Sequence, residues 1–268
     1  MTVSEIGAQY ATGLSRQNIA AALTAAGKDL DHLTPDDLGA LEDFHTLGRI
    51  ATAQLASLAR ITAGDRVLDA GTGIGGTARF LAAACGCQVT AVDLTEEYCQ
   101  TADWLNKLTG LDGKITVRQA DVTELPFADA VFDVVTSQHV QMNVADKARL
   151  YAEAHRVLVA GGRLAAWDVV DGEPGPLDYP LPWADEPDRS RLVPAAGLRA
   201  AIEGAGFTVA HWADLSADAA AFMRAAFSRP PAPLGLHAFV PGFAAKAGNL
   251  TKGLASGRLR VIQAVLVA

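Results

Sequence analysis

Short apolar runs alternate with amphipathic stretches along most of the chain. The apolar runs predict seven strands, at 66–70, 88–93, 114–119, 131–136, 163–169, 207–212 and 258–267. Apolar residues that recur every three or four positions predict helices at 75–85, 96–109, 146–158, 194–205, 217–227 and 241–254. Strands that alternate with helices are typical of a mostly parallel sheet with helices on both faces. The last two strands are consecutive, with the longer insertion 213–257 between them, and they predict an antiparallel pair at the edge of an α/β fold.

The chain before the first strand predicts helices only. Ile19 and Leu23 recur at helical spacing within a helix over 3–27. Thr34 followed by Pro35 is a helix start signal, and the helix that it opens is expected to run to about residue 60. We therefore expect an N-terminal helical cap over 1–62 and a core domain over 63–268. Within the core, the Pro-rich stretch 171–193 and the insertion 213–257 predict lid segments.

Composition narrows the possible partners and the compartment. Half of the 268 residues are hydrophobic, which allows a large core, and 30 acidic residues against 22 Lys and Arg give a net charge of −8. Without a basic cluster, this balance argues against a nucleic-acid partner. The sequence has no apolar run of membrane-spanning length and no visible secretory signal, so we expect a cytoplasmic protein, monomeric or homodimeric. The three cysteines lack metal or redox spacing, and no metal site is expected.

A glycine-rich turn between two acidic strand ends carries the strongest functional signal. The first apolar run ends near Asp69, the turn reads G-x-G-x-G-G from Gly71, and the second run ends in Asp93. An acid at the second strand end can accept two hydrogen bonds from ribose hydroxyls, so the pattern indicates a site for an adenosine-bearing cofactor. A pyrophosphate turn would read G-x-G-x-x-G, and the Asp69 carboxylate would repel pyrophosphate but suit the ammonium of S-adenosylmethionine (SAM). A dehydrogenase that uses NAD, and a turn with no ligand, are the alternatives.

Further motifs extend this pattern over most of the chain. They are DFHTLGR at 43–49, LPF at 125–127 with FD at 132–133, SQHVQMN at 137–143, RVLVAGG at 156–162 and PLPWA at 180–184. With them the chain resembles the class I SAM-dependent methyltransferases, which have a Rossmann-like sheet. Within that class it resembles the group around the glycine, sarcosine and dimethylglycine N-methyltransferases and similar small-molecule enzymes. The family often has Gly at the position of Leu47, so the packing of the lid is expected to differ here.

The resemblance implies roles for individual residues. Gly71 and Gly73 would face the methionine part of SAM, and Gln138 would lie near the sulfonium. Around the adenosine, Asp93 would bind the ribose, while the adenine ring would contact the residues Leu94, Asp121 and Val122. Phe44 and His45 would close over the site from the N-terminal helices.

His139 follows Gln138 and is the candidate general base, because an imidazole titrates near neutrality. The alternative is a hydrogen-bonded structural histidine. Tyr10 and Asn143 are expected in the acceptor pocket. Trp167, at the end of the fifth strand, and Trp183, in the lid, would form an aromatic cage for a methylated ammonium or simply line the pocket.

These residues predict methyl transfer from SAM to a small-molecule acceptor, with S-adenosylhomocysteine (SAH) as the product. Transfer to an amine is slightly favoured over O- or C-methylation of a natural-product or quinone-like substrate. The matched motifs, however, contain no obvious Arg or Lys to hold an acceptor carboxylate, and Arg49 and Arg191 are the nearest candidates. A SAM-binding protein without catalysis is the alternative from a different class.

Overall fold

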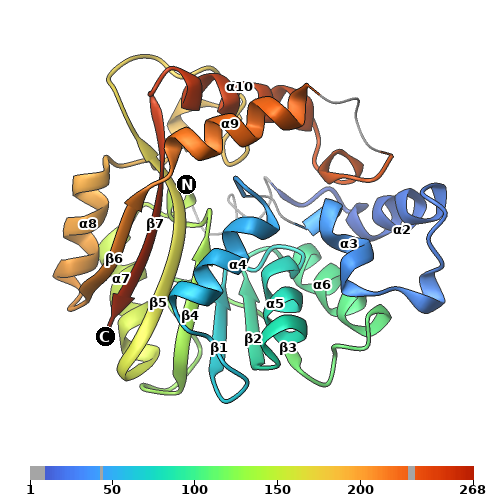
Figure 1. Cartoon of the computed structure of the whole chain (residues 1–268), viewed down its shortest axis with the longest axis horizontal. Helices are drawn as coiled ribbons and strands as arrows, with labels where there is room; N and C mark the ends of the chain where they lie inside the picture. Colours follow the sequence, from blue (N-terminus) through green and yellow to red (C-terminus); the bar gives the residue numbers. More distant parts are fainter. Residues whose placement is uncertain (1–9, 43–44, 229–232) are drawn as a thin grey trace.

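A computed structural model describes residues 10–42, 45–228 and 233–268 of the chain (Figure 1). Its centre is a seven-stranded sheet in the order β3-β2-β1-β4-β5-β7-β6. The strands are β1 (Arg66–Ala70), β2 (Gln88–Asp93), β3 (Ile115–Gln119), β4 (Phe132–Gln138), β5 (Leu158–Asp171), β6 (Thr208–Asp214) and β7 (Leu259–Val267). The predicted α/β, Rossmann-like fold is confirmed, and each strand overlaps its predicted range, although β5 begins at Leu158 and not at 163 and ends at Asp171 and not at 169.

The sheet is parallel except for its last strand in sequence. β1 pairs in parallel with β2 and β4, β2 with β3, and β4 with β5. β7 runs antiparallel between β5 and β6, so the final two strands form the expected antiparallel pair, with β6 at the edge. The carboxyl ends of β1, β2 and β4 consequently meet at one edge of the sheet, where α/β folds place their ligands.

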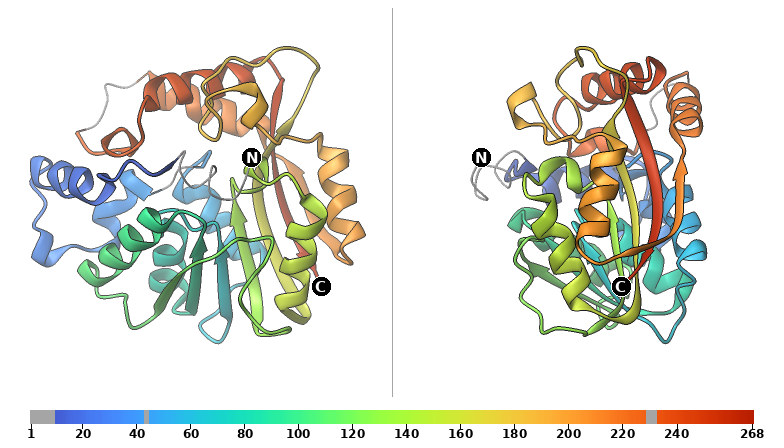
Figure 2. Two further views of the ribbon diagram at one scale, coloured as in Figure 1. Left: turned by 180° about the vertical axis from the view of Figure 1, so that it is seen from behind. Right: turned by 90° about the vertical axis from the view of Figure 1, so that its left-hand side faces the viewer.

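Helices cover both faces of this sheet (Figures 1 and 2). The α-helices are α2 (Ser15–Ala25), α3 (Pro35–Glu42), α4 (Arg49–Leu58), α5 (Gly76–Phe80), α6 (Glu96–Leu108), α7 (Lys147–Val157), α8 (Ala195–Gly204), α9 (Ser216–Phe227) and α10 (Phe243–Ala255). A π-helical turn continues α5 over Leu81–Cys85, and short 3-10 turns occupy Leu30–His32, Gln141–Asn143, Pro187–Arg189 and Leu236–Ala238. None of the described helices is long and apolar enough to cross a membrane.

Separate apolar clusters hold the two layers of helices to the sheet. Leu150 of α7 and Ile202 of α8 pack on one face, against strand residues such as Val135. Ala56 of α4 and Ala78 of α5 pack on the other. α9 and α10, from the predicted lid insertion 213–257, pack beside α4 and lie over the end of the sheet where β5 ends and β7 begins (Figure 1).

The single helix predicted over 34–60 is wrong, because the chain breaks between α3 and α4. Leu47 and Gly48 both have left-handed φ values, of 63° and 52°, which a continuing helix does not allow. Glycine adopts this conformation without strain, whereas Leu47 adopts it with a side chain. The helix predicted over 3–27 is also interrupted: α2 starts at Ser15, and the Glu97 carboxylate accepts the backbone N–H groups of Gly13 and Ser15, at 2.7 and 2.8 Å. The division of the chain into cap and core domains stays a prediction.

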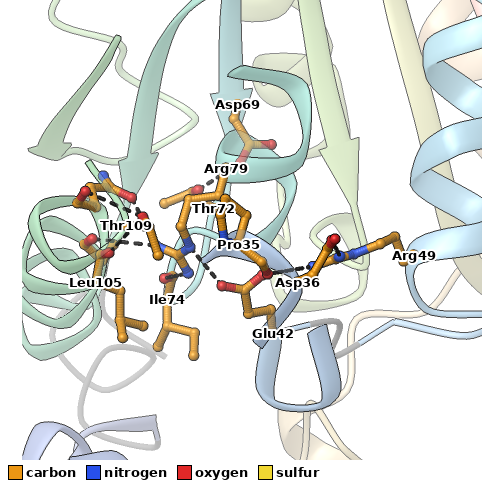
Figure 3. Close-up of polar contacts among 12 residues, drawn as sticks. Pro35, Asp36, Glu42, Arg49, Asp69, Thr72, Ile74, Arg79, Leu105 and Thr109 are labelled. Carbon is orange, nitrogen blue, oxygen red and sulfur yellow. Dashed lines mark hydrogen bonds and ion pairs between the residues drawn. The ribbon is translucent and has the colours of Figure 1, made fainter. Parts of the chain in front are cut away.

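A buried ion pair joins the end of α3 to the core (Figure 3). Arg79 of α5 and Glu42 of α3 have fully buried side chains, and Arg79 Nε donates to Glu42 Oε1 at 2.6 Å. The same guanidinium donates to the carbonyl of Ile74 in the glycine turn, at 2.5 Å, and to Asn106 Oδ1 of α6, at 2.8 Å. Arg49 of α4 contacts the other Glu42 oxygen at 3.4 Å. One buried cation thus connects α3, the glycine turn and α6.

The last two glycines of the turn make room for this ion pair. A Cβ on Gly75 would lie 2.7 Å from Arg79 Nη1, and a Cβ on Gly76 would lie 2.5 Å from Glu42 Cβ. Because atoms cannot approach so closely, any side chain at these positions would displace the pair. The last two glycines of the G-x-G-x-G-G motif therefore allow α3 to pack against the core through this ion pair.

We expect Glu42→Gln to destabilise the fold by about 3–5 kcal/mol, because it leaves the Arg79 charge buried without its partner. Urea denaturation followed by circular dichroism measures the effect. The double variant Glu42→Leu with Arg79→Met removes both charges and should recover most of the loss. Asp36→Asn is the matched control, because Asp36 is exposed and pairs with Arg49 at the surface. Equal stability of Glu42→Gln and Asp36→Asn would contradict this role of the pair.

Candidate cofactor and acceptor site

A cavity of about 310 Å³ opens at the carboxyl ends of β1, β2 and β4. It brings together most of the residues that the sequence singled out, although they come from distant parts of the chain. These are Tyr10, His45, Asp69, Gly71, Gly73, Asp93, Leu94, Asp121, Val122, Gln138, His139 and Asn143. Phe44 lies outside the described residues. The predicted cofactor and acceptor residues thus share one cavity, as a methyl transfer between two bound molecules requires.

Asp69 lies in β1 near its carboxyl end and is 2% exposed. Its carboxylate accepts hydrogen bonds from Thr72 Oγ1 at 2.6 Å and from Thr136 Oγ1 at 2.8 Å. Burial raises the pKa of Asp69 to about 6, although the two threonine hydrogen bonds act in the opposite direction. A carboxylate accepts more than two hydrogen bonds, so Asp69 keeps the capacity to hold a ligand ammonium.

Asp93 ends β2 and organises the glycine turn. Its two oxygens accept the backbone N–H groups of Gly73, at 2.8 Å, and of Thr95, at 2.9 Å. Burial raises the pKa of Asp93, and these backbone hydrogen bonds oppose the shift. A Cβ on Gly73 would meet no atom within 4 Å, whereas a Cβ on Gly71 would lie 2.3 Å from a methyl of Val140. Gly71 thus allows close packing of the 140 loop, and Gly73 has open space at its Cα.

Hydrogen bonds also fix two other predicted cofactor residues, Asp121 and Gln138. Asp121 accepts the backbone N–H and the hydroxyl of Thr123 through one oxygen, both at 2.8 Å. Gln138, the last residue of β4, donates from Nε2 to Thr77 Oγ1 at 2.7 Å and to Thr52 Oγ1 at 3.2 Å. The amide of Gln138 is therefore held between α4 and α5, the helices that cover the turn.

His139 has a left-handed φ of 56°, which is uncommon for a residue with a side chain. Its backbone N–H donates to the carbonyl of Trp167, at 2.8 Å. Its Nε2 accepts the backbone N–H of Thr46, at 3.4 Å, and lies 3.3 Å from Thr46 Oγ1. The ring centroid of His45 is 6.1 Å from that of His139. Burial, and then the charge of His45, hold the pKa of His139 well below 6.5, so the imidazole is neutral at physiological pH.

The expectation that Trp167 and Trp183 line the acceptor pocket is not met by their placement. Both are buried in the apolar cluster beneath α9 and α10, and neither is among the described residues that line the cavity. Trp167 donates from its indole nitrogen to Thr46 Oγ1, at 2.9 Å, and Trp183 donates to Ser190 Oγ, at 3.0 Å. Trp167 lies within β5 and not at its end as predicted, and its indole contacts the site through Thr46, because the ring is buried in the core.

Neither predicted arginine lines the cavity. The Arg49 guanidinium contacts Asp36 at 2.8 Å and Glu42 at 3.4 Å, and Arg191 donates to the carbonyl of Asp188, at 2.7 Å. Sequence reasoning missed several residues that line the cavity, among them Glu42, Tyr98 and Phe239. Tyr98 has its ring centroid 5.9 Å from Tyr10 and 6.2 Å from Phe239, so three distant segments meet in one aromatic wall. No local sequence pattern predicts an aromatic wall that is built from such distant segments.

Comparisons with known proteins identify the class. Residues 68–166 match the family model described as "Methyltransferase domain". The sarcosine/dimethylglycine N-methyltransferase of Halorhodospira halochloris is 36% identical over 50% of this chain and 49% of its own length. The 27-O-demethylrifamycin SV methyltransferase of Amycolatopsis mediterranei is 36% identical over 62% of this chain and 58% of its own. The chain thus spans about half the length of these curated relatives.

Solved structures share the fold over nearly the whole chain. The [4+2]-cyclase SpnF has a TM-score of 0.70 at 22% identity and covers 100% of this chain and 97% of its own. A putative sarcosine dimethylglycine methyltransferase from Galdieria sulphuraria has a TM-score of 0.63 at 18% identity and covers 94% of this chain and 98% of its own. Residues 68–166 belong to the methyltransferase domain family, and the sheet is that of the class I SAM-dependent methyltransferases. The resemblance drawn from the sequence is confirmed, with S-adenosyl-L-methionine as the cofactor that this class uses.

We expect the affinity for SAH to weaken as the pH falls below about 6, by up to about tenfold per pH unit, because Asp69 must be ionised to hold the ligand ammonium. The pKa of this carboxyl is raised in the free protein, so the ionised form is lost as the pH falls through that value. Isothermal titration calorimetry between about pH 5 and 8 measures the dependence. Asp69→Asn should bind SAH more weakly than the unaltered protein near pH 8, and its SAH affinity should depend less on pH. Identical pH profiles of the two proteins would rule out this role for Asp69.

Proposed function

We propose that the chain transfers the methyl group of SAM to a hydroxyl oxygen of a small acceptor that carries no carboxylate or phosphate. The observation that supports this most is the charge of the cavity wall. Among the described residues, the lining includes no Lys or Arg and five acidic side chains, which are Glu42, Asp69, Asp93, Asp121 and Asp146. The charge of Glu42 is paired with Arg79, so the other four carboxyl groups set the charge of the wall.

The acidic wall suits a sulfonium cofactor and opposes an anionic acceptor. A buried carboxylate or phosphate needs a cation or several hydrogen-bond donors, and without them its burial costs several kcal/mol or more. Arg49 is held by Asp36 and Glu42, so it does not supply that cation. An amino acid acceptor such as sarcosine would bring a carboxylate with it. The charge of the wall therefore favours a neutral acceptor over the amino acid amine that the sequence slightly favoured.

His139 supplies a neutral imidazole beside the Gln138 amide. The base form is already present at physiological pH, because the pKa of His139 lies well below 6.5. Nε2 is directed at Thr46, so Nδ1 has to accept the proton of an acceptor hydroxyl. In the structure Nε2 accepts the backbone N–H of Thr46, which places the ring proton on Nδ1. His139 therefore acts as the base only after it gives up this contact for the tautomer in which Nε2–H donates to Thr46 Oγ1, whose other partner is the Trp167 indole N–H. The left-handed backbone of His139 fits a role that needs this one placement of the ring.

Methyl transfer from a sulfonium is an in-line displacement. The acceptor oxygen attacks the methyl carbon, the carbon–sulfur bond breaks, SAH leaves as a neutral thioether, and the hydroxyl proton passes to His139. Alignment supplies most of the rate enhancement in such a reaction, up to about 7–11 kcal/mol in favourable cases. The apolar and aromatic part of the wall, with Tyr10, Tyr98 and Phe239, would exclude water and orient the acceptor.

A methyl-transfer assay with tritiated SAM tests the acceptor class. The panel contains neutral phenols and ring alcohols on one side, and sarcosine and dimethylglycine on the other. We expect labelled product with members of the first group only. Turnover confined to sarcosine or dimethylglycine would contradict the proposal. Tight SAH binding without transfer to any acceptor would favour the non-catalytic SAM-binding alternative.

We expect His139→Ala to lower kcat by about 10²–10⁴-fold, because it removes the group that accepts the hydroxyl proton. The affinity for SAH should stay within about threefold of the starting value, since the adenosine contacts are untouched. His32→Ala is the matched control, because His32 is exposed on a 3-10 turn and should leave both quantities unchanged. A loss of kcat no larger than that of the control would reduce His139 to a pocket-lining residue.

A further inference from the structure

Residues 139–146 form one wall of the cavity without belonging to a strand or an α-helix. Six of these eight residues line it: His139, Val140, Asn143, Val144, Ala145 and Asp146. Only the 3-10 turn Gln141–Asn143 gives the segment regular structure. Its conformation therefore depends on hydrogen bonds from elsewhere.

A buried carboxylate holds the N–H groups at the start of this segment. Asp168 of β5 is 1% exposed, and its Oδ1 accepts the backbone N–H of Val140 at 2.9 Å and of Gln141 at 3.3 Å. The Gln141 side chain also donates to the carbonyl of Val169, at 2.5 Å. The residue directly after His139 is thus fixed to β5.

A buried ammonium holds carbonyl groups in the middle and toward the end of the segment. Lys147 opens α7 and is 8% exposed. Its Nζ donates to the carbonyls of Gln141, at 2.5 Å, and of Val144, and also to the carbonyl of Arg191, at 2.8 Å. These contacts use all three ammonium donors. Arg191 lies in the predicted lid segment 171–193, so Lys147 also ties that segment to the cavity wall.

We propose that Lys147 and Asp168 are positioning residues, which fix the backbone of 139–146 and thereby the placement of the His139 ring for methyl transfer. That this ring placement serves methyl transfer rests on the proposed function above. That Lys147 and Asp168 fix the segment and the ring does not depend on it. A carboxylate on the N–H groups and an ammonium on the carbonyl groups of one short segment specify its path more strongly than neutral partners would, since hydrogen bonds to ionised groups are about twice as strong.

The charged groups around Lys147 make this arrangement sensitive to alkali. Burial lowers the pKa of Lys147 to about 8; the negative charge of Asp168 opposes the shift, and the positive charge of Arg191 adds to it. Asp168 itself has a pKa raised by burial to about 7, and Tyr151 of α7, the other titratable group that faces it, has a pKa raised well above its usual value. When Lys147 loses its proton, it can no longer donate to all three carbonyls. Its pKa is lowered, so the charged form is lost as the pH rises through about 8.

Histidine NMR of the full chain with bound SAH tests the proposal without any acceptor. The ring signals of His139 are assigned by their absence from His139→Ala. Because His139 is neutral throughout this range, a movement of its signals near pH 8 cannot come from its own titration. We expect a movement near pH 8 in the unaltered protein and not in Lys147→Arg, whose guanidinium stays charged. A separate movement near pH 7, from Asp168, should appear in both proteins.

Lys147→Met should shift the His139 signals at every pH and speed hydrogen exchange at the Val140 and Gln141 amides about tenfold or more. SAH affinity should stay within about threefold. Lys107→Met is the matched control, because Lys107 is exposed and pairs only with its helix neighbour Asp103 among the described contacts. Unchanged His139 signals in Lys147→Met, or the same response near pH 8 in Lys147→Arg as in the unaltered protein, would overturn the proposal. If Lys147→Met fails to fold, the comparison of the His139 signals in Lys147→Arg and in the unaltered protein still tests the proposal. None of these results depends on whether His139→Ala loses kcat.

Discussion

The guanidinium of Arg79 is buried directly behind the glycine turn, and three parts of the molecule meet on it. It holds the turn through the Ile74 carbonyl, α6 through Asn106, and α3 through Glu42. A charge in this position has no water to solvate it, so its partners must lie where the guanidinium geometry requires. The consequence for the cavity is direct, because Ile74 and Glu42 both line it. The shape of the cofactor site and the docking of α3 therefore follow from the same interaction.

The sequence predicted the sheet and the cofactor end of the site because both depend on local patterns. Asp69 and Asp93 close neighbouring apolar runs, and the carboxyl ends of parallel strands meet at one edge, so their convergence follows from the topology. The break at Leu47 and Gly48 was missed because the apolar spacing continues across it. The placements of Trp167 and Trp183 were also missed, because a position in a strand or a loop does not tell which way a side chain points.

The acceptor side depended on contacts between distant segments. Lys147 and Asp168 look like ordinary members of a helix start and a strand end, yet both are buried and act on the same loop. The aromatic wall of Tyr10, Tyr98 and Phe239 joins the N-terminal segment, α6 and the stretch before α10. The chain is similar over about half of its length to relatives whose names specify N-, O- and C-methylation. The walls contributed by other segments are consequently where we expect acceptor specificity to arise.

A crystal structure with bound SAH tests the central claim, that this cavity presents the cofactor sulfur to His139. We expect both ribose hydroxyls within about 3.2 Å of the Asp93 carboxylate, the ammonium beside Asp69, and the sulfur facing Gln138 and His139. A ribose away from Asp93, or a sulfur directed away from His139 with the cavity otherwise as described, would contradict the assignment of both residues.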